Sequence, residues 1–280
     1  MSYNKNNIIA IIILSAVILL LSILCITLIQ DKNNKENDEK NNTSHFNHTE
    51  ISSEKSTNST EKNTTSTTQN INVTESTTEK SENKLAQLIK NSGYSISDIE
   101  KQDIEQLVII TDNNNQTNAH LFSLNDGIWS DENITCKAYV GSAGIGNKQN
   151  DIDNITPRGL YTIGEAFYIS TPPSTWLNTF IITENTYWIT DVNSKMYNKR
   201  VESEKIKDEN SAIHMIKSEN NRYGCIINYN TKPVFPDKGS AIFMHCGTTP
   251  TNGSIALEEK NILKFLEILN SEKNPNILIF

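Results

Sequence analysis

The fold is decided by two stretches, GSAIFMHCG at residues 239–247 and TNGSIAL at residues 251–257. The first contains a short apolar run that leads into His245, and the second places Ser254 just before another apolar run. The spacing predicts two strands joined by a turn, with a base at the end of one strand and a hydroxyl at the mouth of the turn. A nucleophile–base pair requires this arrangement. Adjacent strand residues point to opposite faces, so Cys246 should face away from any pocket that His245 faces.

A second motif lies upstream, at residues 156–164, which read TPRGLYTIG. Pro157 favours a turn, and Gly159 can adopt backbone angles that other residues avoid. A strand is predicted over residues 160–163. By itself this pattern is common, and its value lies in its position ahead of the histidine and serine stretches.

A third motif reads YWITD at residues 187–191 and is followed by Tyr197 and Asn198. An aromatic strand of this kind usually packs in a core, and that is the interpretation favoured for Trp188. For Tyr197 and Asn198 two interpretations stay open: they form a structural turn, or they form one wall of a substrate groove.

In this order the motifs resemble the L,D-transpeptidase catalytic domain (YkuD-like) family. Its closest branch reads Gly-Ser-Ala-Ile-Phe-(Leu/Phe)-His, then a turn, then Thr-(Ala)-Gly-Cys-Val-Ala-Leu. The resemblance implies a mainly β fold, an L,D-transpeptidase-like β-sandwich or barrel with a few short helices. His245 matches the base of the family, whereas the position of its nucleophilic cysteine holds Ser254.

The resemblance implies acyl transfer on peptidoglycan stem peptides without a cofactor. Family members attack the peptide bond after the third residue of a stem, form a thioester and pass the acyl group to an amine of a neighbouring stem, which makes 3-3 cross-links. Here His245 would take the proton of Ser254, and the Cys246 carbonyl would orient the imidazole. The backbone N–H groups of Gly253 and Ser254 would receive the oxyanion. Asn252, where many relatives carry a second histidine, would contact substrate together with Tyr197 and Asn198.

Serine in place of cysteine leaves several functions open. A hydroxyl needs a well-placed base and a strong oxyanion hole, whereas a thiol is intrinsically more nucleophilic. Ser254 is either a working nucleophile, in a transpeptidase or an L,D-carboxypeptidase, or part of a pocket that binds stem peptides without acylation. His214 is a rival base, although a lone histidine near an apolar run is more often structural. A third possibility is an unrelated secreted β domain.

The composition of the chain limits the kinds of molecule that it is expected to bind. The net charge of −8 and the lack of basic patches argue against nucleic acid. The four cysteines and five histidines match no metal-site spacing, so no metal is expected. Cys136 and Cys225 would pair only if their strands are neighbours; buried free thiols are the favoured interpretation. The glycine-rich residues 141–146 lack the Lys-Ser/Thr of a phosphate-binding loop and are interpreted as a plain loop.

The chain begins with an apolar run over residues 8–29 that contains no charge and is long enough to cross a bilayer. A cleaved signal peptide is the rival interpretation, but the run exceeds the usual length and no small-x-small site follows. Residues 1–30 are therefore expected to be a single-pass anchor in the cell membrane. The C-terminal domain would lie outside, facing the cell wall.

Residues 31–83 are rich in Asn, Ser, Thr, Glu and Lys and have few large apolar residues, so a disordered linker is predicted. Residues 84–280 form the predicted catalytic domain. A short helix is expected at 84–90, strands at 106–111, 119–124 and 135–140, a helix after residue 257 and a closing strand at 276–280. The polar turns between strands predict mainly antiparallel pairing.

Overall fold

The computed structural model describes residues 80–113, 116–206 and 211–280, all within one of the two units into which the chain divides, Thr64–Phe280. The predicted anchor of residues 1–30 lies outside the described residues, as does the predicted linker up to residue 79. Within the described ranges, no helix has the length and apolar character needed to span a bilayer. Residues 80–83, which the sequence assigned to the linker, are helical.

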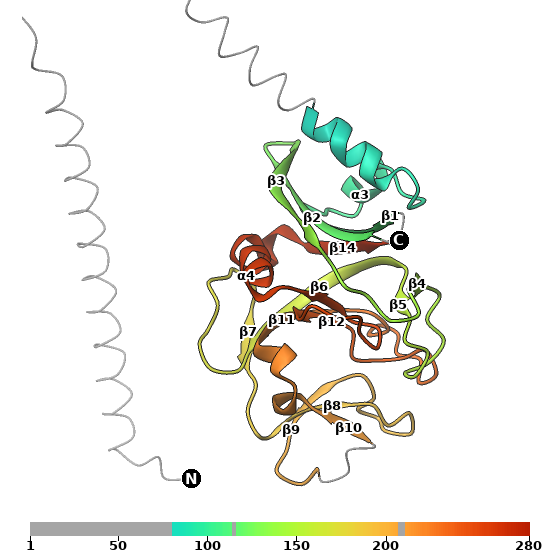
Figure 1. Ribbon diagram of the computed structural model, residues 1–280, viewed down its shortest axis with the longest axis vertical. Coiled ribbons are helices and arrows are strands. Elements are labelled where there is room, and N and C mark those ends of the chain that lie inside the picture. The colour runs from blue at the N-terminus through green and yellow to red at the C-terminus, as the bar shows by residue number, and fades with distance from the viewer. Residues whose placement is uncertain (1–79, 114–115, 207–210) are drawn as a thin grey trace, which may run out of the picture. The chain divides into compact units, whose positions relative to one another are not determined.

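The described body is mainly β, built on one large sheet that is curled like half a barrel (Figure 1). Along this sheet the strands run in the order β13 (Ile255–Leu257), β12 (Phe243–Cys246), β11 (Tyr223–Ile227), β6 (Gly159–Tyr168), β14 (Pro275–Ile279), β1 (Gln106–Asn113), β2 (Gln116–Asn125) and β3 (Ile128–Lys137), with β7 (Thr179–Ile181) beside β6.

Among the described strands the pairing is mainly antiparallel, as expected, with some parallel pairs. Neighbouring strands of the large sheet are antiparallel except in three pairs, β1 with β14, β12 with β13 and β6 with β7. The closing strand explains the first exception. β14 was predicted at nearly the right residues, but it inserts between β6 and β1 and lies parallel to β1.

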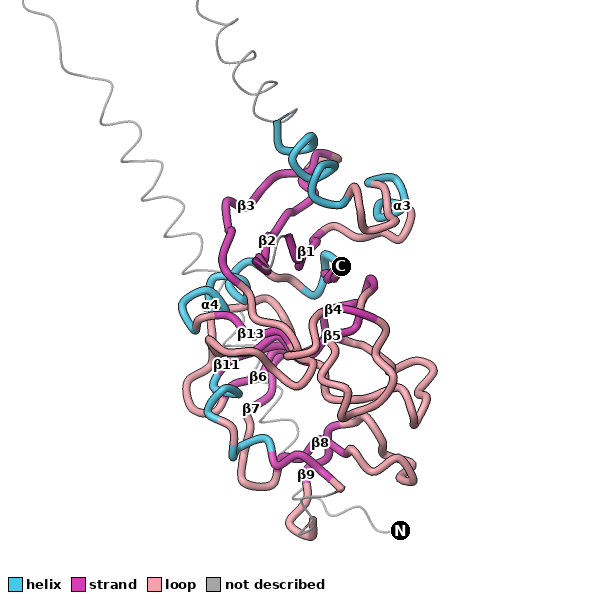
Figure 2. Tube along the Cα trace, turned by 45° about the vertical axis from the view of Figure 1, so that its right-hand side comes forward, coloured by secondary structure: helices cyan, strands magenta, loops and turns pink. Residues whose placement is uncertain are grey.

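Two smaller sheets complete the β structure among the described residues. One consists of β10 (Ala212–His214), β8 (Thr186–Ile189) and β9 (Arg200–Glu202), and the other pairs β4 (Ile145–Gly146) with β5 (Thr156–Pro157). Two 3₁₀ turns, Met215–Lys217 and Glu219–Arg222, lie between β10 and β11, and another, Ser271–Lys273, precedes β14. Figure 2 shows how much of the remaining chain around β4, β5 and β8 is loop.

A helix at residues 80–89 and the short helix α3 (Ile96–Glu100) cover one face of β1, β2 and β14. β1 alternates, with Leu107 and Ile109 packed under these helices and Val108 and Ile110 on the other face. Both faces of β1 are therefore buried, which explains its nearly continuous apolar sequence. Ser95 begins α3 with a capping box to Asp98.

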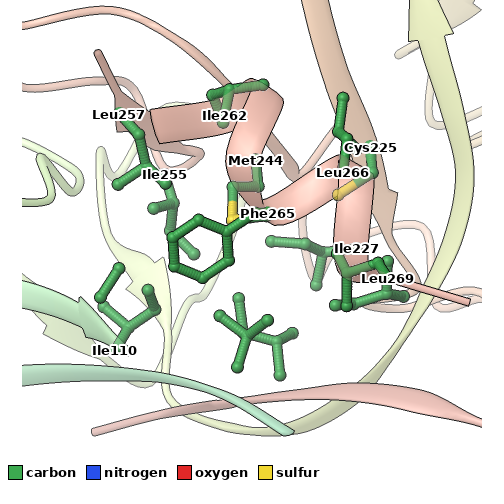
Figure 3. Close-up of a cluster of buried hydrophobic side chains, with 14 of the residues drawn as sticks. Ile110, Cys225, Ile227, Met244, Ile255, Leu257, Ile262, Phe265, Leu266 and Leu269 are labelled. Atoms are coloured by element: carbon green, nitrogen blue, oxygen red, sulfur yellow. The ribbon is translucent and has the colours of Figure 1, made fainter. Parts of the chain in front are cut away.

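The opposite face of the sheet packs against α4 (Glu259–Ile268), as the helix prediction after residue 257 expected. Ile262, Phe265 and Leu266 of α4 are fully buried against strand residues such as Met244 and Ile255, as Figure 3 shows. This cluster fixes α4 directly behind β12 and β13, the strands that carry the candidate site.

A third cluster joins the front of β6, β11 and β12 to the three-stranded sheet. Trp188 of β8 is buried there, and its ring meets that of Phe243 edge-on at 4.9 Å between centroids. The structural interpretation of Trp188 is thus confirmed. The contact holds the small sheet beside the outer end of β12.

Candidate functional site

The register of β12 and β13 puts His245 and Ser254 on one face of the sheet. The two strands pair in parallel with His245 opposite Ala256 and Met244 opposite Ile255. Met244, Cys246, Ile255 and Leu257 all belong to the cluster behind the sheet. Since side chains alternate, His245 and Ser254 project to the front, at diagonal positions with Cα atoms about 8 Å apart by standard strand spacings.

Both residues line one pocket with a volume of about 650 Å³. Its apolar lining consists of Ile152, Ile213, Ala241, Ile242, Phe243 and Pro250. The rest of the described lining is hydroxyl and amide groups, such as Ser218, Asn220, Thr249 and Asn252, together with His245, Ser254 and one carboxylate, Asp151. A pocket with so many neutral hydrogen-bonding groups suits a peptide or a sugar.

His245 is held in the orientation of a base. Its Nδ1 lies 2.8 Å from the carbonyl oxygen of Cys246, which can only accept, so Nδ1 carries the proton and Nε2 is the basic nitrogen. The imidazole is buried, and burial lowers the pKa of His245, with a smaller opposing effect from the hydrogen bond to Cys246. The ring is therefore neutral at pH 7 and can accept a proton.

The hydroxyl of Ser254 is engaged by the backbone of the neighbouring segment. Ser254 Oγ donates to the carbonyl oxygen of Ala241 at 3.2 Å and accepts from the N–H of Phe243 at 3.1 Å. Ala241 has φ of +55°, so the chain turns sharply just before β12, and the serine bridges the turn. The hydroxyl proton thus points to Ala241 and not to His245.

The turn before β13 is shaped by a threonine and a glycine. Gly253 has φ of +140°, and a Cβ there would come within 3.0 Å of the carbonyl oxygen of Ile155. Its N–H, expected in an oxyanion hole, donates to Thr251 Oγ1 at 3.1 Å, and that hydroxyl donates to the carbonyl of Ser254. Gly253 is therefore required by the backbone, and its N–H already has an acceptor within the turn.

Thr156 of the TPRG motif makes hydrogen bonds that support this turn. The fully buried Thr156 accepts from the N–H of Gly141 at 2.7 Å, and its hydroxyl lies 3.4 Å from the carbonyl oxygen of Ser254. The N–H of Ser142 donates to the carbonyl of Thr251. The glycine-rich residues 141–146 thus act as a loop beside the site, ending in the short strand β4, in agreement with the expectation.

Tyr197 and Asn198 lie behind the pocket. Both are buried, at 2% and 4% exposure, and neither lines it. Asn198 Oδ1 accepts from Trp188 Nε1 and from the N–H of Ala241, both at 3.0 Å. This differs from the expected direct contact with substrate. Of the three expected substrate-binding residues, Asn252 alone lines the pocket.

Asp151 is a pocket residue that the sequence analysis missed. Its Oδ1 accepts from the N–H and the hydroxyl of Ser240, at 2.6 and 2.8 Å, and its Oδ2 accepts from Tyr197 Oη at 2.8 Å. Burial, followed by this hydrogen bond to Asp151, raises the pKa of Tyr197 above its usual range. In the sequence, Asp151 is marked only as one of two acidic residues, with Asp153, just ahead of the TPRG motif. The surrounding segment is polar and has no periodicity, so the pattern does not single this residue out.

A buried ion pair lies under the same loop. The side chain of Lys148 is 1% exposed, and Nζ lies 2.7 Å from Asp153 Oδ1. Burial opposes ionisation of Asp153, but hydrogen bonds from Lys148 and from the backbone N–H groups of Gln149 and Ile155 outweigh it and lower the pKa of Asp153 to about 2. Nζ would also be 3.1 Å from a Cβ at Gly253. The pair therefore fixes the loop beside the serine turn.

The described cysteines are not candidates for a nucleophile. Cys136, Cys225 and Cys246 are free, which confirms the interpretation of the first two as unpaired thiols. Cys246 faces the rear cluster, as predicted, and burial raises its pKa to about 11. Within residues 80–113, 116–206 and 211–280, no three His, Cys, Asp or Glu side chains are grouped to hold a metal ion.

The rival base lies outside the pocket lining. The imidazole of His214 stacks on Tyr187 with 4.5 Å between ring centroids, and its Nε2 lies 2.8 Å from the carbonyl oxygen of Glu184. These contacts anchor β10 on β8, which is a structural role.

Comparison with known proteins adds no assignment. No family model matches the chain, and no curated protein matches it.

Proposed function

We propose that residues 84–280 are an L,D-transpeptidase-like domain that acts on peptidoglycan stem peptides by acyl transfer, with His245 as base and Ser254 as acyl acceptor. One observation carries the proposal: a base with its Nδ1 proton fixed and a serine hydroxyl project from adjacent strands into the same pocket. The order of the three sequence motifs supports the proposed assignment to this family.

The reaction would proceed through a serine ester. Ser254 Oγ would attack the carbonyl carbon after the third stem residue while Nε2 of His245 takes its proton. The C–N bond then breaks, and the imidazolium returns the proton to the leaving amine. An amine of a second stem would take the acyl group in a transpeptidase, and water would take it in an L,D-carboxypeptidase. The first step requires the hydroxyl of Ser254 to exchange its hydrogen bond to the carbonyl of Ala241 for one to His245.

A second function is favoured by the contacts of Ser254 itself. Its hydroxyl bridges Ala241 and Phe243, so it serves as a structural link across the turn. A domain in which this link persists would bind stem peptides without acylation. Binding and catalysis would then share the pocket and differ only in whether the serine is released.

The proposed setting is the outer face of the cell membrane. Residues 8–29 would anchor the chain, and the polar residues 31–83 would let the domain reach the wall. The pocket lining, rich in hydroxyl and amide groups, suits a wall peptide.

The decisive test is a search for the acyl-enzyme by mass spectrometry. Full-length protein is incubated with a tetrapeptide stem, and the wild type is compared with Ser254→Ala. Acyl transfer predicts an ester adduct that Ser254→Ala loses, with a cross-linked product if an amine is the acceptor and a tripeptide if water is. Turnover that persists in Ser254→Ala would eliminate the serine mechanism. Binding without an adduct would support the second function.

A sulfur variant tests the pocket separately. Ser254→Cys restores the nucleophile of the family, so we expect it to form a covalent carbapenem adduct that the wild type forms at least tenfold more slowly, because a thiol is the better nucleophile. The measurement is the mass of the intact protein over time. Absence of an adduct in Ser254→Cys would mean that His245 and residue 254 do not cooperate in this pocket.

A further inference from the structure

Among the described residues that line the pocket, one side chain is a carboxylate and none is cationic. Asp151 is the single residue with a formal charge in the described lining, because the pKa of His245 is held below its ordinary value. All three groups that donate to its oxygens are neutral, namely the N–H and hydroxyl of Ser240 and the hydroxyl of Tyr197. None of the ion pairs among the described residues involves Asp151. Its negative charge is therefore oriented but not neutralised.

The carboxylate is also held in place. Ser240 is 5% exposed and Tyr197 is 2% exposed. The two residues that donate hydrogen bonds to Asp151 are therefore themselves fixed by the packing around them. The neighbouring Asp153 is clamped by the buried Lys148, which fixes the loop on the other side. A charged group fixed at a pocket wall loses little freedom when a ligand binds, so more of the interaction appears as affinity.

Asp151 lies close to the reacting positions through a short chain of contacts. Asp151 accepts a hydrogen bond from the hydroxyl of Ser240. The carbonyl oxygen of the next residue, Ala241, accepts a hydrogen bond from the hydroxyl of Ser254. The exposed Ile152, at 84% exposure, continues the lining beside it. A ligand whose carbonyl reaches Ser254 would therefore place groups a few bonds away near this carboxylate.

We propose that Asp151 is a recognition subsite for a primary ammonium group, so that the pocket selects peptides that carry a free amine. The inference rests on the proposed function and deepens it: the preferred stem would be one whose side-chain amine is not yet acylated. An ammonium group would donate to Oδ2 of Asp151, which accepts one hydrogen bond, whereas Oδ1 accepts two.

The test compares two synthetic tetrapeptide probes whose L-Ala amine is acetylated in both, L-Ala-γ-D-Glu-L-Lys-D-Ala with its lysine amine free and the same peptide with the lysine amine also acetylated. Affinities for the full-length protein are measured by calorimetry at low and at high salt. We expect the free-amine probe to bind about tenfold more tightly at low salt, and the preference to shrink as salt screens the charges. Asp151→Asn should bind both probes equally.

Asn at position 151 is a fair replacement because its Oδ1 can keep both Ser240 contacts and its Nδ2 can face Tyr197 Oη. Asp126→Asn is the matched control, since Asp126 is an exposed turn residue with φ of +52°, which Asn tolerates. This variant should keep the preference. Thermal melting of each variant checks folding, and loss of salt dependence in the wild type would count against the subsite independently of any variant.

The outcomes separate the two proposals. Equal binding of both probes by the wild type overturns the ammonium subsite and leaves the stem-peptide pocket standing. A preference that survives in Asp151→Asn also overturns it. Failure of the wild type to bind either probe overturns both. Tighter binding of the free amine, abolished by Asp151→Asn alone, supports the subsite.

Discussion

On the helix-covered face of β1, β2 and β14 the buried cluster is made of hydrocarbon and aromatic side chains, whereas around the pocket buried polar groups bridge one loop to the next. Hydrocarbon contacts are non-directional, so any well-sized residue at the right period serves. The pocket contacts are directional and join segments as distant as Asp151 and Ser240. The difference teaches that strand pattern specifies the scaffold, and individual polar atoms specify the site.

The largest effect should come from breaking the buried ion pair. Lys148→Met leaves Asp153 buried without its cation, so we expect the free energy of unfolding to fall by about 3–5 kcal/mol. Urea denaturation of the variant and the wild type measures this difference in the free energy of unfolding.

Two comparators sharpen the contrast. Ile109→Val removes one methyl group from the helix-covered face and should cost about 0.5–1.5 kcal/mol. Lys260→Met removes an exposed partner of Glu258 and should leave the free energy of unfolding almost unchanged, because solvent screens such a pair. If Lys148→Met costs no more than Lys260→Met, polar contacts do not hold the pocket loops.

An intermediate effect is expected on acidification. The pKa of Asp153 is about 2 in the folded protein, below its ordinary value of 3.8. Its contribution to stability is fully present above that ordinary value and is lost as pH falls from about 4 to 2, because the unfolded chain then binds the proton more readily. Melting temperature as a function of pH measures the decline. Asp153→Asn should flatten it, and an unchanged slope in that variant would assign the acid sensitivity elsewhere.

The smallest effect concerns the backbone at Ala241. Its φ of +55° costs an alanine roughly 1 kcal/mol, part of which a glycine would recover at the expense of greater freedom when unfolded. Ala241→Gly is expected to raise stability by roughly 0.5 kcal/mol, as measured by urea denaturation. Ala119→Gly, in the regular part of β2, should lower it. A loss in both variants would show that position 241 is not strained.

The same division explains what could be predicted from the sequence. The strand at residues 106–111, the helix after residue 257 and the closing strand at residues 276–280 follow from the sequence pattern, and the structure has them close to the expected places. The position of β14 did not follow, because an apolar strand carries no mark of its partner. Neighbour choice depends on contacts that are distant in sequence.

At the site, the sequence pattern anticipated that His245 faces front and Cys246 faces back, since alternation is local. It did not anticipate Asp151 or Lys148, which lie in a loop without period, nor that Tyr197 and Asn198 would be buried. Asp151 and Asn198 are held by Ser240 and Ala241, which lie 89 and 43 residues away in sequence.

The central place of β14 has a consequence for how the protein is made. Residues 275–279 separate β6 from β1, and among the described strands β14 is the one that pairs with both of them. During synthesis the β1–β3 meander can assemble early, but β1 and β6 gain their shared neighbour only once residues 275–279 have emerged. A ribosome-bound or truncated chain lacking it would expose two unpaired strand edges, which are targets for chaperones and proteases.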